Sequence, residues 1–126
     1  MLVGRSGAAS VEQRAAVAAL EARGARVTVA KADVADRAQL ERILREVTTS
    51  GMPLRGVVHA AGILDDGLTP ARFRNVMAPK VQGALHLHAL TREAPLSFFV
   101  LYASGVGLLG SPGQGSTTGG RRGCQR

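Results

Sequence analysis

The stretch GVVHAAG at residues 56–62 decides the fold class of this chain. Its small and β-branched residues run without polar alternation, which is typical of a strand buried on both faces of a parallel sheet. A second apolar stretch, SFFVLY at residues 97–102, follows after one long helical segment. The two stretches therefore predict parallel strands that are joined by a crossover helix.

Helical segments separate the predicted strands along the whole chain. Helices are predicted over about residues 11–23, from a cap at residue 36 to about residue 49, and over about residues 70–92. Their predicted capping residues are Ser10, Asp36 and Thr69, and Val17 and Leu20 line the apolar side of the first helix. Further strands are predicted at residues 2–4 and 26–30. This alternation predicts right-handed βαβ units, and hence an α/β fold with a doubly wound parallel sheet and sites at the carboxyl ends of its strands.

The composition bounds the function classes. A chain of 126 residues with 45% hydrophobic content has the size of one domain. The net charge of +7 raises the question of a nucleic acid partner, yet three of the sixteen basic residues lie in the last six positions. One Tyr and three Phe offer little base stacking, and no zinc or helix-turn-helix pattern occurs. We therefore expect no nucleic acid partner.

The cysteine count and hydropathy predict the compartment. Cys124 is the only cysteine, which excludes an intrachain disulfide or a Cys-rich metal site and fits a reducing cytoplasm. No apolar run approaches the roughly 20 residues that span a bilayer, and the amino terminus lacks the pattern of a signal peptide. The sequence predicts a cytoplasmic protein with no membrane partner and no metal site.

A glycine-rich stretch at residues 105–110 matches the dinucleotide fingerprint G-x-G-x-x-G letter by letter. That fingerprint requires a helix amino terminus directly after the loop and an acidic residue about 20 positions later. Here Ser-Pro-Gly follows at residues 111–113, and the remaining tail contains no acidic residue. A loop is therefore the preferred interpretation of this stretch.

Several short motifs, taken in order, carry a family resemblance. They are GRSG at 4–7, ADVAD at 32–36, HAAGILDDG at 59–67, APKVQG at 78–83, and the stretch from YAS at 102–104 to GQG at 113–115. None of them is specific alone, but the ordered set resembles the ketoreductase domain of modular polyketide synthases, a relative of the short-chain dehydrogenases/reductases. The resemblance covers residues 1–115, and residues 116–126 are expected to form a disordered tail rich in Gly and Arg.

The resemblance implies an incomplete Rossmann-like sheet. Strands 2 to 5 of the family are expected in the chain, whereas strand 1, its Gly-rich phosphate loop and the C-terminal elements are expected to be missing. Strand 1 lies at the centre of the order 3-2-1-4-5, so the strands at residues 2–4 and 56–61 would lose their common neighbour. Unpaired strand edges predict a marginal, aggregation-prone fold when the chain is made alone.

The resemblance also implies an NADPH site. Its cofactor-binding positions are Arg5 and Ser6 for the 2′-phosphate, Asp33 and Val34 for the adenine, and Ala60, Ala61 and Gly62 for the adenosine ribose side. A guanidinium suits the phosphate because it offers two parallel charge-assisted hydrogen bonds. His59 is expected to be a packed strand residue and neither a base nor a ligand.

The implied catalytic residues are Lys80 and Ser104. In such reductases hydride passes from NADPH to the β-keto carbon of an acyl chain on a carrier protein, and a tyrosine protonates the oxygen. By resemblance, Ser104 would hydrogen-bond that oxygen, and Lys80 would bind the nicotinamide ribose and lower the pKa of the tyrosine. The element Leu64-Asp65-Asp66 resembles the one associated with the D-configured, B-type hydroxyl.

The family's tyrosine and asparagine are not found where the spacing places them. Thr117 stands at the tyrosine position and Arg121 at the asparagine position. A threonine hydroxyl is a far weaker acid than a phenol, whose pKa is about 10. Tyr102 does not substitute, since it lies on the predicted strand. We therefore expect the chain to be inactive alone, and a shifted reading frame in a GC-rich gene would explain the tail.

Two function classes remain open, and a third is weaker. The first is a fragment of a reductase that acts on β-ketoacyl groups carried by acyl carrier protein. The second is a catalytically silent subdomain that braces other synthase segments, because related synthases carry truncated reductase-like subdomains. The third, nucleic acid binding through the basic tail, predicts binding that is lost when residues 116–126 are deleted.

Overall fold

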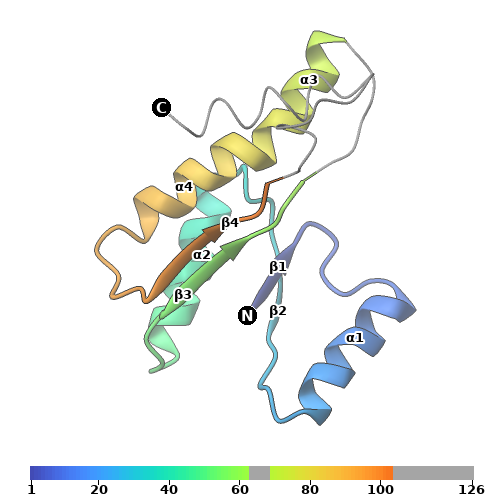
Figure 1. The fold of residues 1–126 in the computed structure, drawn as a ribbon, viewed down its shortest axis with the longest axis vertical. Helices are drawn as coiled ribbons and strands as arrows, with labels where there is room; N and C mark the ends of the chain where they lie inside the picture. The colour runs from blue at the N-terminus through green and yellow to red at the C-terminus, as the bar shows by residue number, and fades with distance from the viewer. Residues whose placement is uncertain (63–68, 104–126) are drawn as a thin grey trace. The chain divides into compact units, whose positions relative to one another are not determined.

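The computed structural model describes residues 1–62 and 69–103 (Figure 1). Its elements are β1 (Leu2–Gly4), α1 (Val11–Ala22), β2 (Val29–Lys31), α2 (Arg37–Thr49), β3 (Gly56–His59), α3 (Pro70–Met77), the π-helical turn η1 (Ala78–Gln82), α4 (Gly83–Leu90) and β4 (Phe98–Leu101). The structure divides into two compact units, an N-terminal unit, Met1–Asp33, and a C-terminal unit that begins at Val34, and each is described separately.

The N-terminal unit is one βαβ unit. Strands β1 and β2 pair in parallel, with Leu2 opposite Val29, and α1 connects them. The predicted cap is confirmed, because the Gln13 amide donates to Ser10 Oγ at 3.1 Å and the Ser10 amide donates to Gln13 Oε1 at 3.0 Å. No residue of α1 is buried, however, and Leu20 is 41% exposed. The two short strands therefore cover the apolar side of this helix only in part, since Val17 is half-buried.

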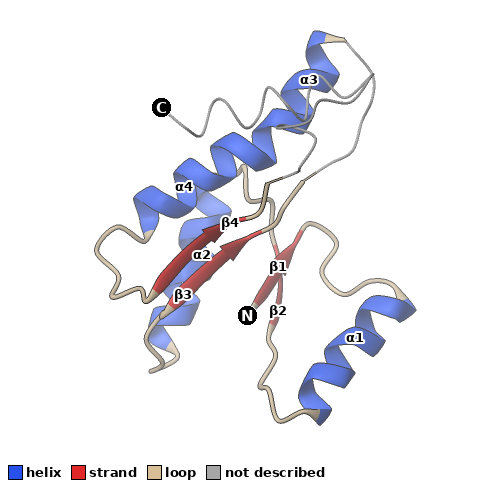
Figure 2. Cartoon of the chain, viewed as in Figure 1, coloured by secondary structure: helices blue, strands red, loops and turns tan. Residues whose placement is uncertain are grey.

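The C-terminal unit holds the main hydrophobic core. Strands β3 and β4 pair in parallel, and helices α2 and α4 are the helices that pack with them (Figure 2). The core is formed by Leu40 from α2, Val57 from β3 and Leu87 from α4, with Phe99 of β4 packed against it. Side chains alternate along a strand, so these residues define the face of the strand pair that the helices cover.

The opposite face of this strand pair is exposed, which makes the predicted burial of both faces wrong. Val58 is 57% exposed, Phe98 51% and Val100 40%. Helices of the C-terminal unit pack only on the face that carries Val57 and Phe99. The apolar composition of β3 fitted burial on both faces, but the described helices of the C-terminal unit cover only one face.

The predicted long helix has the predicted extent but is not a continuous α-helix. Its middle is the π-helical turn η1, in which the Gly83 amide donates to the Ala78 carbonyl. Pro79 explains the change of pitch, because proline has no amide hydrogen and its ring clashes with the carbonyl four residues earlier. One wide turn accommodates the proline, and α4 begins directly after it at Gly83.

The described strands form two separate two-stranded sheets, β1-β2 and β3-β4. Both ladders are parallel, and helices alternate with the strands, as predicted. The limits of β1 are as predicted, and those of the other strands differ from the predicted ones by at most three residues. Within the described ranges no helix is long and apolar enough to cross a membrane.

Candidate functional site

The carboxyl ends of β1 and β2 bring together three of the predicted cofactor residues. The Gly4 carbonyl accepts hydrogen bonds from the Gly7 amide at 3.1 Å and from the Ala32 amide at 3.2 Å. The first bond closes a turn through Arg5 and Ser6, for which Gly7 adopts a φ of 63°. The second ties the end of β2 to that turn. Arg5, Ser6 and Asp33 therefore lie at the same edge of the N-terminal unit.

The chemistry of this edge suits an anion. Arg5 and Ser6 are exposed, and within residues 1–62 and 69–103 Arg5 forms no ion pair with a carboxylate. An exposed guanidinium at a strand end, beside a serine hydroxyl, can hold a phosphate through charge-assisted hydrogen bonds. The donor set therefore fits the 2′-phosphate of NADPH.

Val34 has a different environment from Asp33. It begins the C-terminal unit, is half-buried, and packs against the core cluster of Leu40, Val57 and Leu87. Its side chain therefore contributes to the core. Only the part of the Val34 side chain that remains exposed outside the core could contact an adenine ring.

The carboxyl end of β3, in the C-terminal unit, carries another group of predicted binding residues. The Tyr102 amide donates to the His59 carbonyl at 2.9 Å, which extends the pairing of β3 and β4 to the point where Ala60 and Ala61 emerge, both exposed. A Cβ placed on Gly62 would lie 3.4 Å from Lys80 Cε. The stem of Lys80 thus lies over Gly62, and the structure brings the predicted catalytic lysine to the predicted ribose loop.

His59 lies under this part of the site. The side chain is 6% exposed, and its Nε2 lies 2.9 Å from the carbonyl oxygen of Pro79. Burial lowers the pKa of His59 below its ordinary value, and contacts with the backbone carbonyls of Pro79 and Lys80 oppose that shift only in part. The prediction of a packed strand residue is confirmed, but the hydrogen bond to η1 was not predicted.

Gly83 is a further residue that sequence reasoning missed. A Cβ at this position would lie 2.9 Å from Val34 Cγ2 and 3.2 Å from His59 Cε1. Only glycine lets the start of α4 approach the end of β3 so closely. A glycine inside a predicted helix was the available signal, since it weakens a helix unless packing requires it.

The remaining predicted site residues lie outside the described part of the chain. They are Ser104, Thr117, Arg121 and the element Leu64-Asp65-Asp66. The glycine-rich stretch at 105–110, Cys124 and the tail at 116–126 also lie outside it. Within the described residues no group of three or more His, Cys, Asp or Glu side chains could hold a metal ion.

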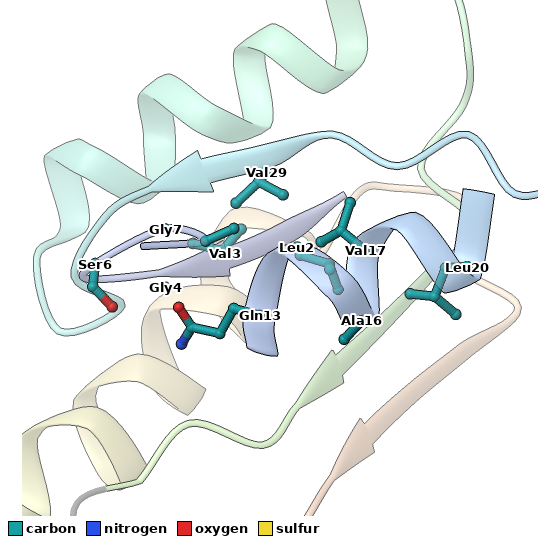
Figure 3. A pocket seen from close by; sticks show the side chains of 11 residues that line it. Leu2, Val3, Gly4, Ser6, Gly7, Gln13, Ala16, Val17, Leu20 and Val29 are labelled. Carbon is teal, nitrogen blue, oxygen red and sulfur yellow. The ribbon is translucent and has the colours of Figure 1, made fainter. Parts of the chain in front are cut away.

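One cavity of about 310 Å³ lies in the N-terminal unit (Figure 3). It is lined by side chains of β1, the following turn, α1 and β2, among them Leu2, Val17, Leu20 and Val29. Ser6 is the only predicted cofactor residue among its lining residues. The cavity is the incompletely filled space between α1 and the two strands, and it is largely apolar.

Fold and site together define a class of protein. Parallel strands alternate with helices, and the candidate nucleotide-binding residues lie at the carboxyl ends of β1, β2 and β3. This is the arrangement of a partial Rossmann-like fold, in which ligands bind at the carboxyl ends of the strands.

The comparisons with known proteins identify the family. A family model described as KR domain matches residues 1–122. The chain is 44% identical over 120 residues to the polyketide synthase GfsB of Streptomyces halstedii, which covers 92% of this chain and 2% of that protein. It is 44% identical over 118 residues to the mycoketide-CoA synthase of Mycobacterium tuberculosis, and this match covers 90% of this chain and 3% of that protein. The chain belongs to the KR domain family of modular polyketide synthases.

Solved structures agree with this assignment. A ketoreductase from the first module of phoslactomycin biosynthesis in Streptomyces sp. HK803 superposes with a TM-score of 0.86 at 33% identity, over 94% of this chain and 28% of that chain. A ketoreductase domain from the bacillaene assembly line gives a TM-score of 0.88 at 33% identity, over 94% of this chain and 29% of that chain. The chain therefore spans less than a third of these solved reductase chains.

Proposed function

We propose that this chain is a segment of a ketoreductase that uses NADPH to reduce the β-keto group of an acyl chain held on acyl carrier protein. The observation that carries the proposal is the position of Lys80, whose stem lies over Gly62 at the carboxyl end of β3. A lysine at a nucleotide-binding strand end suits the binding of a ribose hydroxyl. The KR family uses NADPH, and membership of that family supports the same cofactor here.

Each residue then has a role in binding or in proton transfer. NADPH supplies the hydride when it is bound. Arg5 and Ser6 bind the 2′-phosphate, Asp33 and Val34 border the adenine, and Ala60, Ala61 and Gly62 border the adenosine ribose. Lys80 binds the nicotinamide ribose, and Ser104 donates a hydrogen bond to the keto oxygen, where negative charge develops during reduction.

The proton donor is the step that this chain does not supply. Thr117 occupies the position of the family's tyrosine, and Arg121 occupies the position of its asparagine. A hydroxyl that Lys80 could bring toward neutral pKa is therefore lacking at this position. We propose that the chain alone binds cofactor without catalysing reduction, and that it acts in the cytoplasm as part of a larger synthase.

The stereochemical part of the proposal rests on Leu64-Asp65-Asp66, which favours the B-type product. Two similar solved structures are described as A-type and A1-type ketoreductases, at 37% and 35% identity. Overall similarity thus does not separate the two types, so the local element carries this part alone.

A non-catalytic structural subdomain is the second candidate. It is favoured by Thr117 at the proton-donor position and by the exposed apolar face of Val58, Phe98 and Val100. Such a face suits contact with other synthase segments, because exposed apolar patches mark interaction surfaces. The two candidates differ in whether NADPH binds.

Nucleotide binding by the full chain tests the proposal. We expect NADPH to bind more tightly than NADH, and Arg5→Ala to weaken NADPH binding about tenfold or more without changing NADH binding, since hydrogen bonds to charged groups contribute about 1.5–3 kcal/mol. Arg26→Ala is the matched control, because Arg26 is exposed in the same unit.

Two results would contradict this proposal. Absence of NADPH binding would remove the cofactor role and favour the structural subdomain. Equal losses with Arg5→Ala and Arg26→Ala would show a general charge effect and not a phosphate site. A β-ketoacyl thioester added with NADPH tests the separate claim of inactivity, which steady loss of NADPH absorbance would refute.

A further inference from the structure

His59 and the π-helical turn η1 form a connection between β3 and the helix that carries Lys80. The imidazole Nε2 and the Pro79 carbonyl oxygen are 2.9 Å apart, across 20 residues of sequence. Both partners are buried, and Lys80 directly follows Pro79. The bond therefore fixes the backbone at the residue next to the lysine.

Because Lys80 lies within the π-helical turn, the hydrogen bond between His59 and Pro79 affects the position of Lys80. Pro79 interrupts the α-helical hydrogen-bond pattern, and π-helical turns are rare and occur mostly as single turns inside α-helices. The direction in which Lys80 leaves the helix depends on how that turn is held. A hydrogen bond from a strand residue supplies an anchor that the helix itself lacks.

The packing around the imidazole fixes the ring. Its Cε1 lies 3.2 Å from the position of a Cβ at Gly83, so α4 packs closely against the ring at a point where a side chain would fit only if the ring shifted. With this contact on one side and the Pro79 carbonyl on the other, the ring has little freedom to rotate. A fixed ring holds η1 at a set distance from β3.

We propose that His59 is a positioning residue that holds η1 against the end of β3 and thereby places the Lys80 stem over Gly62. The proposal rests on the proposed role of Lys80 in the reductase site. A carbonyl oxygen only accepts, so the neutral ring carries its hydrogen on Nε2 and donates it to Pro79. The lowered pKa of His59 is consistent with this neutral form.

The first measurement reads the ring in the unmodified chain. Long-range proton–nitrogen NMR spectra distinguish the two neutral tautomers, and the chain has only three histidines to assign. We expect the Nε2–H tautomer for His59. A ring hydrogen on Nδ1, or averaging between the tautomers, would overturn the proposal without any substitution.

The second measurement reads the lysine itself. The full chain contains two lysines, Lys31 and Lys80, so competitive acylation followed by mass spectrometry gives the rate ratio of their amines directly. We expect His59→Met, which removes the donor at similar size, to change this ratio about fivefold, the factor expected for one net hydrogen bond. His59→Gln, which restores a donor near Nε2, is expected to return the ratio to the wild-type value.

Controls separate positioning from loss of structure. His88→Met alters an exposed histidine that contacts Phe99 edge-on, and it should leave the ratio unchanged. Amide exchange at Leu40 and Ile43, which are buried on α2, reports whether the C-terminal unit stays folded. If His59→Met loses that protection, the test uses two other measurements instead. They are the tautomer of His59 in the unmodified chain and the lysine rate ratio of His59→Gln compared with that of the wild type. A changed ratio in His59→Gln despite intact protection would overturn the proposal.

The two proposals fail separately. If the Lys80 ratio responds to His59 but the chain does not bind NADPH, positioning stands and the reductase assignment fails. If NADPH binds and Arg5→Ala weakens it, while the Lys80 ratio ignores His59, the reductase assignment stands and positioning fails.

Discussion

The Gly83→Ala substitution tests the packing of the C-terminal unit most directly. The added methyl group would lie 2.9 Å from Val34 Cγ2 and 3.2 Å from His59 Cε1. Carbon atoms in favourable contact are about 3.5–4.0 Å apart, so both distances are too short. Neither neighbour yields easily, because valine has few allowed rotamers and the imidazole is held by Pro79.

The expected change in the free energy of unfolding is the difference between a steric cost and a gain in helix propensity. Overpacking of this kind costs about 1–3 kcal/mol. Alanine in a helix is favoured over glycine by about 1 kcal/mol, which offsets part of that cost. Taking the middle of the overpacking range, we expect a net loss of about 1 kcal/mol in the free energy of unfolding of the C-terminal unit, although the same change in an open helix would be stabilising.

Native-state amide exchange measures this loss in the unit where it occurs. Exchange at the core residues Val57 and Leu87 should accelerate about fivefold, the factor that corresponds to about 1 kcal/mol. Gly4→Ala is the matched control, since a Cβ there meets no atom within 4 Å and the substitution lies in the other unit. Unchanged or slower exchange in Gly83→Ala would refute the close approach of α4 to β3.

Three other substitutions test separate parts of the structure. Leu40→Ala removes a side chain that is 2% exposed in the core, and it should destabilise the C-terminal unit by about 2–5 kcal/mol, measured by urea unfolding followed by circular dichroism. Ser10→Ala breaks the capping box and should weaken α1 by about 1 kcal/mol, seen as faster amide exchange in its first turn. Hydrogen bonds from Gln39, the backbone amide first, lower the pKa of Asp36. The unfolded state therefore binds the proton more readily, so the contribution of Asp36 is present above its unfolded pKa and is lost as the pH falls through its folded pKa. Asp36→Asn keeps a good cap and should reduce this acid loss of helicity, whereas an unchanged pH profile would exclude Asp36 as its source.

The local elements could be predicted because their signals are local. Ser10 and Asp36 bond to the amides three residues ahead, as their spacing indicates, and both helices begin where those caps predict. The extent of the segment from Pro70 to Leu90 also followed from helical periodicity. Caps and periodicity depend on neighbours along the chain, so no tertiary information is needed to read them.

The candidate site could be predicted in part. The family resemblance named Lys80 and the loop at 60–62 together, and the structure places the Lys80 stem over Gly62. The hydrogen bond from His59 to Pro79 was not predictable, because the two residues are 20 positions apart and their contact depends on how α4 packs on β3. Composition also misjudged Val58, whose exposure depends on which faces the helices cover.

The sequence by itself determined the alternation of strands and helices, the helix starts, the family, and the identity of the residue at each expected catalytic position. Only the tertiary structure decided that the described strands form two separate pairs, that one face of β3 and β4 is exposed, and that Pro79 converts the middle of the long helix into a π-helical turn anchored by His59. The physical reason is the distance along the chain over which each kind of interaction acts. Capping and periodicity act over a few residues, whereas pairing, burial and the approach of α4 to β3 are set by contacts between segments distant in sequence.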